Sequence, residues 1–164
     1  MAELLFITPE EMTYSTILSG NIDVDKYRYV VLNTQVTTIE PLLGSELYDK
    51  IIADLEGDTL TGLYLTLYND YIKPITKFES VAQFIEVASY LVDNGGIFKQ
   101  TPEGKEVVTK DEVQYLSQKY KSLSQMYVTR FNKWICNNTL TEYKTYQDEV
   151  NAIKDISLLT GWKL

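Results

Sequence analysis

The sequence has no histidine among its 164 residues and a single cysteine, Cys136. Without histidine, the chain has no His-based catalytic triad, no imidazole proton shuttle and no imidazole ligand for zinc. One cysteine excludes an internal disulfide and the thiolate clusters that hold zinc or iron–sulfur groups. A cysteine nucleophile normally uses histidine as its base, so we expect Cys136 to be a small buried side chain.

Long apolar runs and targeting segments are also missing. No stretch of 18 apolar residues occurs, so we expect no transmembrane helix and no membrane partner. The first eleven residues contain no basic residue and become acidic at once, which predicts that they are not a signal peptide.

Carboxylates are plentiful, but their pattern indicates no active site. Glu79 and Glu86 lie two helical turns apart, which is typical of a solvated helix face, and no partner base accompanies them. Gly57 and Gly62 have the spacing of a phosphate-binding loop, but Leu63 follows where that loop needs its lysine. We therefore expect no catalytic residue, no metal or cofactor site, and a protein that is not an enzyme.

The residues that are present fit one helical domain. An apolar fraction of 45% is ordinary for a globular protein, and a chain of this length buries roughly 70% of its unfolded surface. Thirteen tyrosines against five phenylalanines predict many half-buried positions, because tyrosine has an apolar body and a polar tip.

Charge is distributed unevenly along the chain. Residues 1–96 carry 15 acidic and 5 basic side chains, whereas residues 97–164 carry 8 acidic and 10 basic ones. Phosphate binders need clustered cations, and the basic residues of the second half are interleaved with acidic ones. We therefore interpret the basic residues as a solvated helix face.

Prolines and capping residues mark the first helices. Thr8-Pro9-Glu10-Glu11 is typical of an N-cap, an N1 proline and an acidic first turn, and predicts a short helix that ends at Gly20. Asp23 or Asp25 begins the next helix. We expect that helix to end at Pro41, since proline disfavours the α conformation of the residue before it.

The stretch from Ile39 to Ile51 joins two helices through a very short turn. Gly44 adopts positive φ without strain, and Ser45 is the expected N-cap of a helix that ends before Gly57. Thr59 or Thr61 begins a further helix, whose apolar periodicity continues to Val92. Pro74 either kinks this helix or divides it in two.

A small β-hairpin and a long helix are expected next. Asn94-Gly95-Gly96 ends the preceding helix, and the segments 97–100 and 105–108 flank a turn at 101–104. Thr109 to Glu112 form a capping box for the longest helix, whose apolar stripe continues to Trp134. The predicted fold is all-α: a compact bundle of about five to six helices with one small protruding β-hairpin and an extended C-terminal arm. We place the helical domain at residues 1–138, with the hairpin near 97–108, and the arm at residues 139–164.

Three segments together resemble the head–tail connector (adaptor) proteins of tailed bacteriophages. They are Ile39-Glu-Pro-Leu-Leu-Gly-Ser-Glu-Leu-Tyr-Asp-Lys-Ile51, Tyr71-Ile-Lys-Pro74, and Tyr90-Leu-Val-Asp-Asn-Gly-Gly-Ile-Phe98. The resemblance covers roughly residues 22–138 in order and spacing. It implies a structural virion protein at the head–tail neck, made in the host cytoplasm. Such adaptors form a ring, usually of twelve copies, that joins the portal protein to tail components and lets DNA pass without reading it.

The resemblance also implies contacts between subunits. Apolar residues of the hairpin and the arm are the candidate anchors: Ile97, Phe98, Val107, Val108, Leu158, Leu159, Trp162 and Leu164. The alternative hypothesis is a soluble acidic α-helical module that binds a partner helix in a groove.

Overall fold

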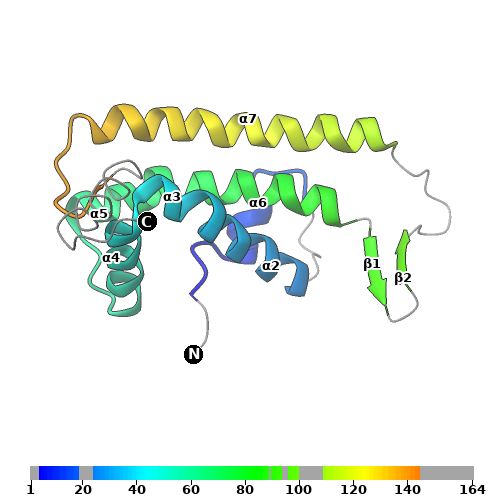
Figure 1. Cartoon of the computed structure of the whole chain (residues 1–164), viewed down its shortest axis with the longest axis horizontal. Coiled ribbons are helices and arrows are strands. Elements are labelled where there is room, and N and C mark those ends of the chain that lie inside the picture. Colours follow the sequence, from blue (N-terminus) through cyan, green and yellow to red (C-terminus); the bar gives the residue numbers. More distant parts are fainter. Residues whose placement is uncertain (1–3, 19–23, 89, 94–95, 100–108, 145–164) are drawn as a thin grey trace, which may run out of the picture.

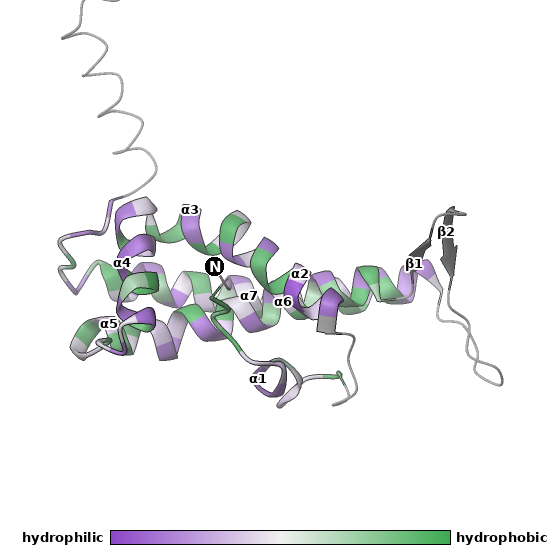
Figure 2. Ribbon diagram, turned by 90° about the horizontal axis from the view of Figure 1, so that it is seen from below, coloured by the Kyte–Doolittle hydropathy of each residue, from purple (hydrophilic) through white to green (hydrophobic). Residues whose placement is uncertain are grey.

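The computed structural model of the chain describes residues 4–18, 24–88, 90–93, 96–99 and 109–144 (Figure 1). The architecture is all-α, as the apolar periodicity predicts. The long helix α7 (Lys110–Ile135) lies along α6 (Lys73–Val87), and α2 (Val24–Thr34) packs against α6 as well. Polar and apolar residues alternate along these helices in Figure 2, as expected where one face of a helix is buried.

Helix α1 (Pro9–Thr13) begins as predicted but ends early. Thr8 is its N-cap, and Thr8 and Glu11 form a reciprocal capping box. The prediction that this helix continues to Gly20 is wrong, because Tyr14 is already extended and Ser15 has a φ of 59°. A positive φ at a residue with a side chain cannot continue a right-handed helix.

The expected stop at Pro41 is also wrong, since the helix passes through it. The π-helical turn η1 (Gln35–Ile39) follows α2 directly, and α3 (Glu40–Leu43) continues from it with Pro41 in its first turn. Proline in a regular α-helix clashes with the carbonyl group four residues earlier. The wider π turn, in which the N–H of Glu40 donates to Gln35 O, relieves this clash.

Pro74 repeats the same arrangement. Helix α5 (Gly62–Leu67) leads into the π turn η2 (Tyr68–Ile72), and α6 follows with Pro74 in its first turn. The N–H of Lys73 donates to Tyr68 O, five residues earlier. Pro74 therefore neither ends nor divides the helix; a π turn accommodates it.

The short turn between α3 and α4 (Ser45–Glu56) forms nearly as predicted. Gly44 has a φ of 77°, which only glycine adopts readily. Gly44 itself is the N-cap, so Ser45 is the first helical residue. Helix α4 ends at Gly57, and Thr61 is the N-cap of α5, as expected.

Helix α6 ends sooner than the periodicity predicts. It stops at Val87, and two short strands follow: β1 (Tyr90–Asp93) and β2 (Gly96–Lys99), paired antiparallel with Val92 opposite Ile97. The predicted hairpin with its turn at 101–104 is not supported. The strand containing Ile97 pairs instead with the segment before it, with Asp93 opposite Gly96. Residues 100–108 lie outside the described residues.

The core consists of two clusters that meet along α6 and α7. One gathers residues of η1, α3, α4 and η2 around Phe6 and Phe131, and the other gathers residues of α1, α2 and α6 around Tyr27 and Tyr120. The capping box at Thr109 and Glu112 is confirmed. Cys136 follows α7 and is exposed, so the expectation of a buried cysteine is wrong.

The chain returns to the bundle after α7. Leu140 is buried in the Phe6 cluster, and the Tyr64 hydroxyl donates to Glu142 Oε2 at 2.6 Å. Lys144 forms an ion pair with Glu46 of α4. Residues 139–144, the first part of the expected arm, therefore pack against α4 and α5.

Candidate functional site: a groove between α1 and α6

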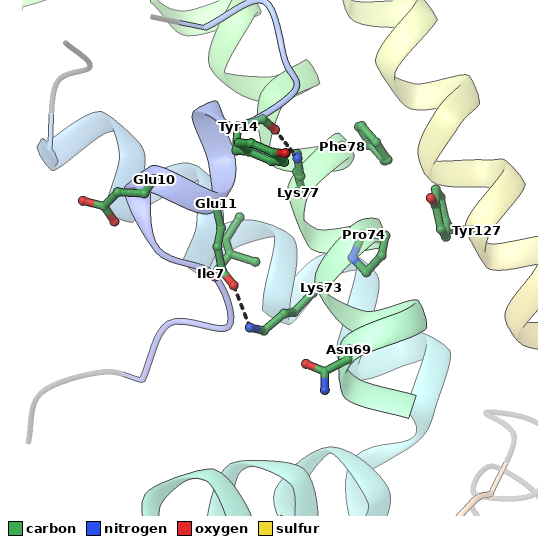
Figure 3. Close-up of a pocket in the computed structure, with 10 residues that line it drawn as sticks. All are labelled: Ile7, Glu10, Glu11, Tyr14, Asn69, Lys73, Pro74, Lys77, Phe78 and Tyr127. Atoms are coloured by element: carbon green, nitrogen blue, oxygen red, sulfur yellow. Dashed lines mark hydrogen bonds and ion pairs between the residues drawn. The ribbon is translucent and has the colours of Figure 1, made fainter. Parts of the chain in front are cut away.

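A groove of about 440 Å³ lies where α1 crosses α6, with α7 at its far side (Figure 3). This volume is near the lower end of the range for ligand pockets. Ten residues from five segments line it: Ile7, Glu10, Glu11, Tyr14, Asn69, Lys73, Pro74, Lys77, Phe78 and Tyr127.

The position of α1 depends on Glu11. One carboxylate oxygen accepts the backbone N–H of Thr8 at 2.9 Å and so closes the capping box. The other accepts a hydrogen bond from Lys73 Nζ at 2.6 Å. A second lysine one turn later, Lys77, donates to the backbone carbonyl of Tyr14. Two lysines of α6 thus hold α1 and the residue that follows it.

The other side of the groove is aromatic. Phe78 and Tyr127 lie with their ring centroids 5.6 Å apart, and Arg130 lies 5.0 Å from the Tyr127 ring. Tyr14 is 76% exposed and covers Lys77, whose Nζ is 5.5 Å from its ring. Pro74 also lines the groove. It lies in the first turn of α6, where the π turn η2 accommodates it.

Burial and neighbouring groups shift the pKa values of Glu11 and Lys77 in the groove. Partial burial raises the pKa of Glu11, but the hydrogen bonds from Lys73 and Thr8 outweigh it, so the net shift is downward. Burial lowers the pKa of Lys77, and the Glu11 carboxylate opposes that effect. The groove therefore combines a lysine–glutamate ion pair with aromatic surface.

The N-terminal segment beneath the groove is held by side chains. Gln35, in the π turn η1, accepts the N–H of Phe6 at 2.9 Å and donates to the carbonyl of Leu4 at 3.1 Å. The Tyr68 hydroxyl donates to the carbonyl of Phe6 at 2.8 Å, and the Tyr27 hydroxyl donates to that of Ile7. Burial and the nearby Glu11 raise the pKa of Tyr68 to about 12, so its hydroxyl stays protonated and keeps donating.

Sequence reasoning did not find this groove. Glu11 and Lys73 are 62 residues apart, and no local pattern indicates that they meet. Two weak sequence features could have indicated the groove. One is the acidic pair at residues 10 and 11, and the other is the pair of lysines at 73 and 77, which lie four residues apart on one helix face.

The predicted interface residues lie elsewhere. Ile97 and Phe98 are in β2, opposite Val92 and Leu91 of β1. The remaining six, Val107, Val108, Leu158, Leu159, Trp162 and Leu164, lie outside the described residues.

In the part of the chain that the structure describes, no group of three or more histidine, cysteine, aspartate or glutamate side chains is placed to hold a metal ion. No helix in the same ranges is long and apolar enough to cross a membrane.

Comparisons with known proteins give one match. A family model described as a family of unknown function (DUF6712) matches residues 39–155, which is more than half of the chain. Comparisons with curated proteins and with solved structures gave no match.

Proposed function

We propose that this chain, which belongs to the family of unknown function DUF6712, is a structural virion protein: a head–tail connector that forms a ring between the portal and tail components. The ring is a channel through which DNA passes, and the chain acts in the virion neck without catalysis.

One observation supports this proposal most directly, the order of elements in residues 39–135. Two helices meet at the Gly44 turn, a central helix passes through Pro74, two short strands follow, and a long capped helix closes the bundle. The Gly44 turn, the helix through Pro74 and the long capped helix are elements that the resemblance to connector proteins implies, whereas the strands lie at 90–99 and not in the expected hairpin near 97–108. Residues 39–135 lie within the region that the family model matches. Net negative charge is compatible with a DNA channel, since acidic walls repel phosphates and let DNA slide.

In this proposal the subunit contacts include the end of the molecule that carries β1 and β2, and the C-terminal arm. Ile97, Phe98, Val107, Val108, Leu158, Leu159, Trp162 and Leu164 are the proposed anchors. Figure 1 shows β1 and β2 beyond the end of α6, away from the Gly44 turn. An isolated two-stranded hairpin is marginally stable, so contact with a neighbouring subunit or the portal stabilises it.

Disruption of the gene in a virus that carries it tests the proposal. We expect DNA-filled heads and free tails that fail to join, seen by electron microscopy, and joining restored by the wild-type chain supplied in trans. The chain should also be found by mass spectrometry in purified particles. Normal tailed particles without the chain contradict the proposal. Complementation with a chain that lacks residues 155–164 tests the arm separately. If that variant joins heads to tails normally, the arm is not required for joining.

The groove favours a second candidate, an acidic helical module that binds a partner segment. Its aromatic side and its volume suit a peptide or the exposed side chains of a helix. Tyr14→Asp distinguishes the two candidates. A connector with this change still joins heads to tails, whereas a module that acts through the groove loses its partner.

A further inference from the structure

The start of the chain crosses the bundle and fills its core at two points. We define residues 4–13 as the N-terminal strap and the described residues from Val24 onward as the body. Phe6 and Met12 of the strap are fully buried, Phe6 in the cluster of α4 and Met12 in the cluster of α2. An empty strap site would leave cavities in both clusters, so the folded state keeps the site filled.

The body binds the strap through side chains. Gln35, Tyr68 and Tyr27 form hydrogen bonds with the backbone that precedes α1. Lys73 pairs with Glu11 at 2.6 Å, a contact between α6 and α1 that Figure 3 shows. None of these contacts depends on the covalent connection between strap and body. The same segment of a second copy therefore fits the site equally well in shape and charge.

The bend that follows the strap is strained. Tyr14 is extended, and Ser15 has a φ of 59°. A side chain disfavours this left-handed conformation, which glycine adopts freely. Residues 14–18 contain neither glycine nor proline, and the sequence signals of α1 predict a helix that continues past Ser15. The bend is therefore imposed by the return of the strap to its own body, and the Thr16 hydroxyl, which donates to Met12 O at 2.9 Å, helps to hold it closed.

The chain is attached to the body again directly after the bend. The Ile17 N–H donates to the Tyr120 hydroxyl of α7 at 2.8 Å, and Leu18 packs against the cluster of α2. The Ile17 side chain itself is 58% exposed. The strained bend thus separates a segment with its own binding site from a fixed point on the body, and short strained hinges of this kind favour the exchange of a segment between copies.

We infer that the N-terminal strap is exchanged between copies of this chain: the bend at Ser15 opens, and the strap of one copy fills the strap site of a second. The exchanged strap makes the same contacts as the closed one, while the strain at Ser15 is released. The two opened bends then lie next to each other, where exposed Ile17 of each copy contributes apolar surface. This inference goes beyond the proposed function and does not depend on it, since the strap lies outside residues 39–155, which the family model matches.

Protein concentration sets the balance between the closed and exchanged forms. A strap tethered to its own body competes with an effective concentration in the millimolar range. Exchange therefore requires a protein concentration of about 1 mM, or a neighbour held close by in an assembly, unless the strain at Ser15 shifts the balance to lower concentration.

Two substitutions at Ser15 shift this balance in opposite directions. Ser15→Gly removes the strain of the closed bend, and Ser15→Val increases it, because a β-branched residue rarely adopts positive φ. Full-length chains are refolded from urea at about 10 μM to about 1 mM and sized by sedimentation velocity, with circular dichroism to verify the fold. We expect Ser15→Val to associate at a concentration about tenfold below that of the wild type, because each exchanged pair contains two bends. Ser15→Gly should stay monomeric over the whole range.

Charge reversal identifies the strap as the exchanged part. In Glu11→Lys and in Lys73→Glu the strap and its site carry like charges, so each variant alone neither closes nor exchanges well. In an equimolar mixture each strap finds an oppositely charged site only on the other variant. We expect complexes that contain equal numbers of the two variants, measured by native mass spectrometry. Glu11→Lys combined with Lys73→Glu in one chain is the matched control; it restores the pairing and should associate like the wild type.

Three outcomes overturn the inference. In the first, the wild type and both Ser15 variants stay monomeric or associate at the same concentration. In the second, the mixture of charge variants stays monomeric, which shows that each strap remains in its own site. In the third, each charge variant alone associates as strongly as the mixture, which shows that copies meet through another surface. All three are measured on the isolated chain, so they are independent of the test of head–tail joining.

Discussion

At the scale of single residues, buried polar side chains decide how the segments of this chain meet. Gln35 binds the N-terminal segment, and the Ser80 hydroxyl donates to Thr34 Oγ1 at 3.1 Å between α6 and α2. Each buried polar atom that finds a partner adds specificity, and each one without a partner costs stability.

Thr76 is the exception among the buried polar residues. Its hydroxyl is buried and has no hydrogen-bond partner among the described residues. Thr76→Val replaces the hydroxyl with a methyl group of similar size, so we expect the free energy of unfolding to rise by about 1 kcal/mol. Urea denaturation measures the change. Ser80→Ala is the matched control on the same helix and should lower stability by about 1 kcal/mol, because it removes a buried hydrogen bond to Thr34 Oγ1, which then keeps only the donor Gln83 Nε2 at 3.2 Å. A loss of stability in Thr76→Val contradicts this account.

Glu86 makes part of the stability dependent on pH. Hydrogen bonds from Ser117 and then Lys121 lower the pKa of Glu86. The folded chain therefore binds this proton more weakly than the unfolded chain does. The contribution of ionised Glu86 is present above the unfolded pKa and is lost as the pH falls through the folded pKa.

We therefore expect Ser117→Ala to raise the pKa of Glu86, measured by NMR titration of its carboxyl group. Glu86→Gln should destabilise the chain at pH 7 and have less effect at a pH of about 3, because the contribution of ionised Glu86 is lost as the pH falls towards its lowered folded pKa. Side-chain exposure of 46% keeps the effect modest. An equal loss of stability at both values excludes this linkage.

At the scale of the elements, the two π turns explain how prolines remain inside helices. In each case a five-residue π turn ends two residues before the proline. A π turn accommodates one extra residue within an α-helix. If that residue is removed, the turn becomes regular α-helix, and the helix faces before and after it keep their relative orientation.

Deletion of Asn69 tests this interpretation. The deletion converts η2 into regular α-helix and brings Pro74 against the carbonyl four residues before it, which we expect to cost about 3 kcal/mol. Pro74→Ala in the same chain should recover most of the loss, as measured by urea denaturation. Deletion of Gln125 in the regular helix α7 is the control; it rotates one half of the helix by about 100° and no proline substitution rescues it. If Pro74→Ala does not rescue the Asn69 deletion, the π turn has another cause.

At the scale of the whole molecule, the N-terminal segment connects the two core clusters. Phe6 is fully buried in one cluster, with its ring 5.7 Å from Tyr48 and 6.0 Å from Tyr68, and Ile7 is buried in the other. Both clusters share α6 and α7, so we expect them to unfold together.

Phe6→Ala should lower the free energy of unfolding by about 3 to 5 kcal/mol, because it leaves a cavity among fully buried side chains. Hydrogen exchange measured by mass spectrometry should show faster exchange in both α2 and α4, although Phe6 belongs to the cluster of α4 alone. Faster exchange confined to α4 indicates that the two clusters unfold independently.

The sequence by itself determined the all-α class, the Gly44 turn, the N-cap at Thr8 and the capping box at Thr109, because spacing and conformational preference act over a few residues. It also indicated the apolar stripe of α7, where Tyr120 and Phe131 are buried. Other features were decided only by the tertiary structure. The helices continue through Pro41 and Pro74, and the Phe6 N–H donates a hydrogen bond to Gln35. Glu11 pairs with Lys73, and Cys136 is exposed. Local patterns predict which face of a helix is apolar. Only the packed chain decides which partner that face meets, since the contact energy depends on residues far away in the sequence.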